Sequence, residues 1–246
     1  MTHKQNYLFF LFLGLILLCS CSSKKEMLYF SDVDVTTQDK IVFSPSTIRP
    51  NDILSIVISS STPELAVMYN QNTTPATGYL VSLDGMITLP VLGKIKAQDL
   101  TLMDLENVLA KTLIDGKHLA NPIVTVRLLN AKFTVLGEVN NPGTYPFSEQ
   151  NISILQALGY AGDLTIHGKR QDLLIIREEN NSKTYMRIDM TSKKWFDSPY
   201  YYIKPNDVIY VNPNDAKVKS AGYISSVGGL LGLISIALST FLILTK

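Results

Sequence analysis

The sequence of 246 residues has little of several residue types on which common functions depend. It contains two cysteines, three histidines and one tryptophan. Both cysteines, Cys19 and Cys21, lie near the N-terminus, so no disulfide framework can hold the rest of the chain together. Lys and Arg number 22 against 21 for Asp and Glu, without a basic block, which argues against a nucleic-acid-binding protein.

The sequence also lacks the residue patterns of common catalytic and metal sites. Its histidines are isolated from one another, and no HExxH, CxxC, GxSxG or P-loop spacing occurs. Asp84, Asp163 and Asp207 each lie beside a turn residue, where an aspartate commonly bonds the local backbone. We therefore expect no enzyme activity, no metal site and no cofactor.

Residues 1–20 are almost entirely apolar and predict a signal peptide. The apolar run 7–18 is too short to cross a bilayer comfortably but suits a signal-peptide core. Leu18, two small residues and Cys21 resemble the bacterial lipobox, which implies cleavage between Ser20 and Cys21 and lipidation of Cys21. By the same analogy, Ser22 favours sorting to the outer membrane. The alternative is an ordinary signal peptide with two incidental cysteines or a short disulfide motif.

Residues 21–40 follow as a polar leader, which we interpret as a tether after the anchor. Its aspartates, Asp32, Asp34 and Asp39, fit a solvated linker better than a metal site.

The segment 214–246 is predicted to be a C-terminal transmembrane helix. Residues 227–244 carry no formal charge and span about 27 Å as a helix, close to the ~30 Å hydrocarbon core. Small residues recur on one helical face at Gly228, Gly232, Ser235 and Ser239, a spacing that lets helices approach closely. A lone anchoring helix is one interpretation. Self-association is favoured, because a lipidated protein has little need of a second anchor.

Between these ends, strand-like runs alternate with one helix in each of two modules, 41–128 and 129–213. The first predicts a hairpin turned at Asp84–Gly85 and a helix over 102–113 capped by Thr101. The second predicts a helix over 154–160 capped by Ser153 and a hairpin turned at Asn180–Asn181. The expected fold class is α+β, with two β-grasp-like modules.

One aromatic group in the second module suits sugar binding. Tyr200, Tyr201 and Tyr202, with Trp195 and Phe196, have faces that can stack on pyranose rings. The favoured alternative is that these rings pack into the core or into a subunit interface.

Several motifs, in order along the chain, resemble one known family. Three of these motifs resemble the polysaccharide export domain: Pro50–Ile56, Gly78–Gly93 and Asn121–Arg127. Four further motifs resemble the β-grasp module that accompanies this domain, called SLBB: Val135–Tyr145, Ala157–Gly162, Gly168–Arg170 and Pro205–Tyr210. The resemblance is therefore to the Wza-like polysaccharide export outer-membrane lipoproteins.

That resemblance implies a passive channel component for capsular or extracellular polysaccharide. Such proteins are anchored to outer-membrane lipid with the main body in the periplasm, and they form homo-oligomeric rings. Their further partners are an inner-membrane polysaccharide co-polymerase or chain-length protein and the polysaccharide cargo. This chain departs from the pattern in holding one SLBB module and a rather apolar terminal helix. A lipid-anchored periplasmic adaptor without a pore is the alternative function.

Overall fold

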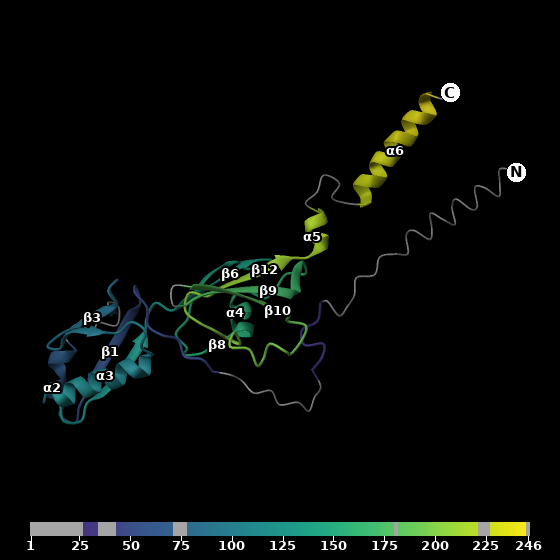
Figure 1. Cartoon of the computed structure of the whole chain (residues 1–246). Coiled ribbons are helices and arrows are strands. Elements are labelled where there is room, and N and C mark those ends of the chain that lie inside the picture. Colours follow the sequence, from purple (N-terminus) through teal and green to yellow (C-terminus); the bar gives the residue numbers. More distant parts are fainter. Residues whose placement is uncertain (1–26, 34–42, 71–77, 180–181, 221–226, 245–246) are drawn as a thin grey trace.

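The computed structural model describes residues 27–33, 43–70, 78–179, 182–220 and 227–244. Within these ranges the protein is a mixed α/β molecule with several sheets and few helices. Buried apolar side chains form two separate cores, one between residues 48 and 126 and the other between residues 131 and 211. Figure 1 shows the corresponding modules side by side along the molecule.

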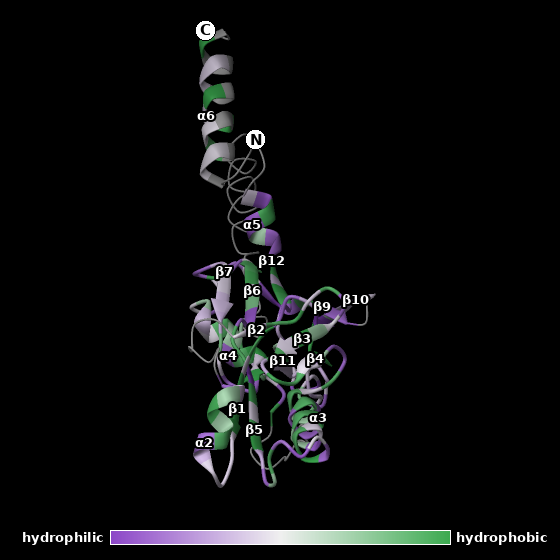
Figure 2. Cartoon of the chain, turned by 90° about the vertical axis from the view of Figure 1, so that its left-hand side faces the viewer, coloured by the Kyte–Doolittle hydropathy of each residue, from purple (hydrophilic) through white to green (hydrophobic). Residues whose placement is uncertain are grey.

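The first module is built on a three-stranded antiparallel sheet in the order β2-β1-β5. The bounds of its elements are β1 Ile53–Ser59, α2 Pro63–Ala66, η2 Val67–Tyr69, β2 Tyr79–Leu80, β3 Met86–Leu89, β4 Gly93–Lys96, α3 Leu102–Asp115 and β5 Ile123–Leu128. Alternate residues of β1 are buried because successive strand side chains point to opposite faces. Figure 2 shows hydrophobic residues, in green, along β1, β5 and α3.

Helix α3 covers the buried face of this sheet. Its N-terminus is a capping box, in which Thr101 accepts from the Asp104 backbone and Asp104 reaches back to Thr101. Leu105, Leu109 and Leu113 recur every four residues and are fully buried. The predicted helix is confirmed, together with its cap.

The hairpin predicted around Asp84–Gly85 is wrong, although these residues do form a turn. Strand β2 pairs with β1 instead, with Tyr79 opposite Leu54, and β3 pairs with β4. The pairing with β1 buries Tyr79 in the first core. A turn motif such as Asp84–Gly85 contains no information about this burial, which favours the pairing with β1. The turn between β3 and β4 contains Val91 with a φ of 66°.

The second module contains a five-stranded sheet in the order β10-β9-β12-β6-β7. The bounds of its elements are β6 Lys132–Gly137, β7 Gly143–Pro146, β8 Ile152–Ser153, α4 Ile154–Tyr160, β9 Gly168–Glu179, β10 Ser182–Ile188, β11 Tyr202–Ile203 and β12 Val208–Pro213. Strands β6 and β12 are parallel, and the other neighbours are antiparallel. Gly137 ends β6 with a φ of 90°, where an added Cβ would lie 2.1 Å from the Val211 carbonyl oxygen.

Helix α4 and the two-stranded β8-β11 ladder accompany the five-stranded sheet. A capping box formed by Ser153 and Gln156 starts α4, so the predicted helix is confirmed. The hairpin predicted at Asn180–Asn181 is confirmed as paired strands, since Ser182 of β10 lies opposite Glu179 of β9. The two asparagines themselves lie outside the described residues.

The two modules meet at a short connection between β5 and β6. Leu128, at the end of β5, packs against both cores. The side chain of Asn130 accepts from the Ile53 backbone N–H at 2.9 Å and donates to the Asn51 carbonyl oxygen at 2.9 Å. The connection is thus tied to the start of β1 by a side chain as well as by the backbone.

The described part of the predicted tether, residues 27–33, is largely exposed but docked on the protein rather than extended freely into solvent. This segment runs beside the second module, and its backbone N–H groups at Phe30 and Ser31 donate to Met190 and Thr191 carbonyl oxygens. Asp32 accepts from Ser192 and Lys193, so its carboxylate bonds protein groups rather than water alone. Asp34, Asp39 and the rest of the tether lie outside the described residues.

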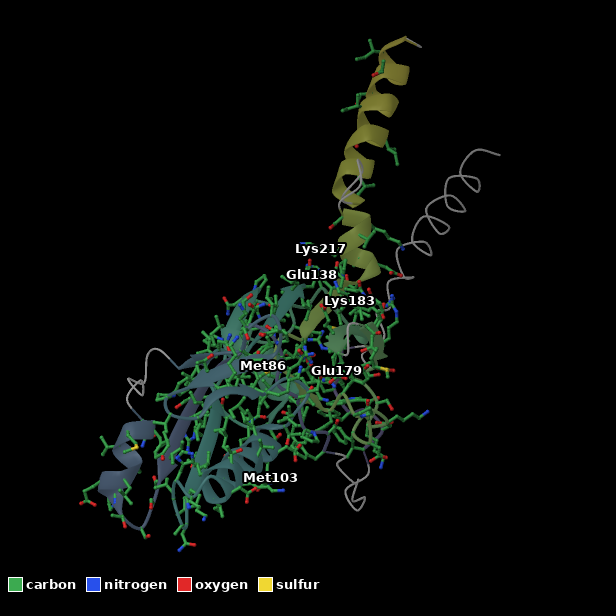
Figure 3. All side chains as sticks on the ribbon, turned by 60° about the vertical axis from the view of Figure 1, so that its left-hand side comes forward. Met86, Met103, Glu138, Glu179, Lys183 and Lys217 are labelled. Atoms are coloured by element: carbon green, nitrogen blue, oxygen red, sulfur yellow. The ribbon has the colours of Figure 1, made fainter. Side chains whose placement is uncertain are left out.

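Two helices follow β12, α5 Asp215–Ser220 and α6 Val227–Leu244. Lys217 of α5 lies 3.9 Å from Glu138, and Figure 3 labels both residues at the base of this helix. A helix is therefore present in the predicted C-terminal segment. The prediction that it crosses a membrane is not supported, because within the described ranges no helix is both long and apolar enough to span one.

Candidate functional site

The three consecutive tyrosines of the second module are in contact with other protein groups. Tyr201 stacks on Trp195, with ring centroids 5.7 Å apart and planes 24° apart. The Arg177 guanidinium carbon lies 4.5 Å from the ring centroid of Tyr200, whose hydroxyl lies 2.9 Å from the Thr184 hydroxyl. Tyr202 makes an edge contact with Phe43.

These contacts are what the packing interpretation of the tyrosines predicted. Trp195 is 6% exposed, and one face of Tyr201 lies against it. Tyr200, Tyr201 and Tyr202 are partly exposed, so their sugar-binding role stays a prediction.

Beneath these tyrosines lies a buried ion pair that joins β9 to the turn before β12. The Arg177 Nη2 lies 2.8 Å from an Asp207 carboxylate oxygen, and both side chains are almost fully buried. Arg177 also donates to the Pro199 and Tyr202 carbonyl oxygens. Burial raises the pKa of Asp207, while the hydrogen bond and charge of Arg177 oppose that shift.

A second ion pair continues this network toward the first module. Lys204 donates to Glu179 at 2.8 Å, to the Ser44 hydroxyl at 3.2 Å and to the Pro45 carbonyl oxygen at 3.5 Å. Burial raises the pKa of Glu179, but the hydrogen bond and positive charge of Lys204 outweigh it and leave the pKa below its usual value. The network therefore connects Ser44 and Pro45, which lie at the start of the first module, with the second module.

Two of the three aspartates predicted at turns, Asp163 and Asp207, bond local backbone groups. Asp163 accepts from the Leu164 N–H at 2.7 Å, and Asp207 accepts from the Lys204 N–H at 2.8 Å. Asp84 accepts from the Ser82 hydroxyl. In the part of the chain that the structure describes, no three His, Cys, Asp or Glu side chains gather as metal ligands would. The predicted cleavage and lipidation residues, Ser20 and Cys21, lie outside the described ranges.

The predicted helix-packing residues of α6 are exposed. The hydroxyl of Ser235 donates to the Leu231 carbonyl oxygen at 2.8 Å, and that of Ser239 donates to the Ser235 carbonyl oxygen at 2.8 Å. Their hydrogen-bond donors are thus satisfied within the helix. A Cβ added to Gly232 would have no neighbour within 4 Å, so this position is open to another helix. Gly228, Gly232, Ser235 and Ser239 together form what we call the small-residue stripe.

Comparison with known protein families distinguishes the two modules. Residues 43–129 match the family described as polysaccharide biosynthesis/export protein, and residues 132–189 match the SLBB domain. The chain therefore contains a polysaccharide export domain and an SLBB domain. Its first module is therefore the export domain, and its second module contains the SLBB domain. The core of the second module continues beyond the SLBB match to β12.

Two relatives support this assignment at low sequence identity. The chain is 25% identical over 198 residues to the EPS I polysaccharide export outer membrane protein EpsA of Ralstonia solanacearum, covering 74% of this chain and 52% of the relative. It is 25% identical over 199 residues to the protein of the same name from Ralstonia nicotianae, covering 74% and 51%. The chain spans about half the length of these curated relatives.

Sequence reasoning missed two features of the SLBB module. One is the buried Arg177–Asp207 pair, because its two residues lie 30 positions apart and each is ordinary in its local motif. The other is the docking of residues 27–33. The adjacent aromatic residues Tyr29 and Phe30 were its available signal, since a solvated tether has no use for two large rings in succession.

Proposed function

We propose that this protein is a ring-forming component of an outer-membrane machine that exports extracellular polysaccharide. The observation that carries the proposal is the order of an export domain and an SLBB domain in one chain. The names of the two relatives, which specify polysaccharide export and the outer membrane, support the same conclusion. The role is that of a passive conduit for the polymer.

Cys21 is the proposed lipid attachment site, and cleavage after Ser20 would make it the first residue of the mature protein. Lipidation would hold the chain at the outer membrane with its main body in the periplasm. Polysaccharide and the energy for its movement would come from an inner-membrane co-polymerase or chain-length partner. The cargo would be capsular or other extracellular polysaccharide.

Assembly would use α6 and the two β-grasp-like modules. The small-residue stripe offers a surface on which copies of α6 can approach closely, and its serine hydroxyls are already bonded within the helix. Packing between copies of α6 would gather the subunits around a common axis. The export and SLBB modules would then enclose the passage below.

The test is single-particle electron microscopy with mass determination on the full-length lipoprotein in mild detergent. We expect closed rings with a central passage and a mass that is a whole multiple of the acylated chain. A monomer or dimer without a passage would overturn the ring and favour a lipid-anchored adaptor. A deletion strain complemented with the intact gene should recover surface polysaccharide if the chain serves export.

A further inference from the structure

We call residues 27–33 the strap. For so short a segment, the strap makes many contacts with the second module. The Tyr29 hydroxyl donates to Asp163 at 2.5 Å, and the Arg170 guanidinium carbon lies 5.3 Å from the Tyr29 ring centroid. Phe30 lies against Trp195 and Phe196, with ring centroids 6.2 and 5.3 Å away. The strap therefore combines a polar contact with an aromatic one.

Several observations separate the strap from an incidental surface contact. Phe30 has a φ of 53°, a conformation that a large L-residue rarely adopts unless its surroundings hold it. Its backbone N–H and that of Ser31 donate to the Met190 and Thr191 carbonyl oxygens at 3.1 and 2.7 Å. Burial and the Asp163 carboxylate raise the pKa of Tyr29, which keeps its hydroxyl protonated as a donor.

The position of the strap limits where the N-terminus can be. Met27 follows Cys21 by six residues, and an extended chain covers at most about 3.6 Å per residue. The backbone at Cys21 must therefore lie within about 20 Å of the start of the strap. If the strap were released, the 22 residues up to Phe43 could reach about 75 Å.

We propose that the strap clamps the lipidated N-terminus to the SLBB module and so holds the face around Trp195 next to the lipid surface. The proposal rests on the lipidation of Cys21 that forms part of the proposed function. The partner that contacts this face is the headgroup layer of the membrane into which the acyl chains insert.

The position of the strap agrees with a lipid surface as the partner. Figure 1 shows the strap, in purple, on the side of the SLBB module away from the export domain. The export domain would accordingly stand away from the membrane.

The chain carries its own probe for this arrangement, because Trp195 is its one tryptophan and contacts the strap. The acylated full-length protein is reconstituted in vesicles of phosphatidylethanolamine and phosphatidylglycerol with a dansyl lipid. Energy transfer from Trp195 to dansyl is then measured. In a variant with both Tyr29→Ala and Phe30→Ala, we expect transfer to fall at least twofold and acrylamide quenching of Trp195 to rise.

Two controls make the readout specific. Tyr185→Ala removes an exposed aromatic ring from β10 and should change neither measurement. A chain with Trp195→Phe and Met103→Trp carries its probe on the export domain, where Figure 3 labels Met103, and should show weak transfer. Transfer from that probe equal to transfer from Trp195 would overturn the proposal.

The remaining outcomes separate the strap from lipidation. The mass of the mature chain reports whether Cys21 is acylated. An unmodified Cys21 would overturn the lipid anchor of the proposed function and the strap proposal with it. If Cys21 is acylated but the Tyr29→Ala and Phe30→Ala variant keeps the full energy transfer, the strap proposal alone is overturned. This holds even if acrylamide quenching of Trp195 rises in that variant.

Discussion

The Arg177–Asp207 pair is the most heavily buried polar contact among the described side chains of the SLBB module, at 3% and 1% exposed. A buried charge is tolerated when its partner and further hydrogen bonds replace water. Asp207 accepts from Arg177 and from the Lys204 backbone, and Arg177 also donates to two carbonyl oxygens. The pair thereby fixes the loop that carries the tyrosines to strand β9.

Arg177→Ala should lower the free energy of unfolding by about 3–5 kcal/mol, because it leaves the Asp207 carboxylate buried without its partner. Arg187→Ala is the matched control. It breaks an ion pair with Asp172 in which the arginine is 64% exposed, and it should cost less than about 1 kcal/mol. Denaturant unfolding followed by Trp195 fluorescence measures both. Equal losses in the two variants would contradict this assignment.

Among the elements, those with a local signal were predicted and those that depend on distant partners were not. Both helix starts follow from capping boxes within four residues, at Thr101 and Ser153. Asp84 and Gly85 predicted a turn correctly but the strand partners wrongly. Strand pairing depends on which residues become buried together, and β2 reaches β1 from 20 or more positions away.

Helix α6 provides a test of assembly that leaves its own folding intact. Gly232→Leu puts a large side chain into the small-residue stripe, where it should block close approach and shift the particle mass from rings to smaller species. Leucine is a better helix former than glycine, which costs about 0.8–1 kcal/mol relative to alanine, so loss of the helix is not the cause. The measurement is mass determination of the detergent-solubilised lipoprotein.

Thr240→Leu is the control for this variant because it adds bulk to the same helix outside the stripe. At 100° per residue, Thr240 lies about 80° around the helix from Gly232 and about 120° from Gly228. Its hydroxyl donates to the Ile236 carbonyl oxygen and has no role in the stripe. Rings that persist with Gly232→Leu, or that are lost equally with Thr240→Leu, would show that α6 does not direct assembly through this face.

At the scale of the whole molecule, the sequence predicted two modules and the family motifs within them. It did not predict how the modules are joined. Asn130 and Lys204 make that connection through backbone groups at Asn51, Ile53 and Pro45. An asparagine between two strands reads locally as a turn residue, so nothing adjacent to it indicates a clamp to a strand 77 positions away.

The clamp at Asn130 should set how narrowly the export and SLBB modules are oriented. Spin labels at Met103→Cys and Lys194→Cys place one probe on each module, and an acylated Cys21 leaves no competing thiol in the mature chain. Asn130→Ala removes both side-chain hydrogen bonds and should broaden the measured distance distribution. Asn151→Ala, at an exposed site, is the matched control and should leave the distance distribution unchanged.

Because a closed ring needs every subunit at the same angle, Asn130→Ala should also reduce the fraction of closed rings. An unchanged distribution would mean that Leu128 and the backbone hold the two modules without the clamp.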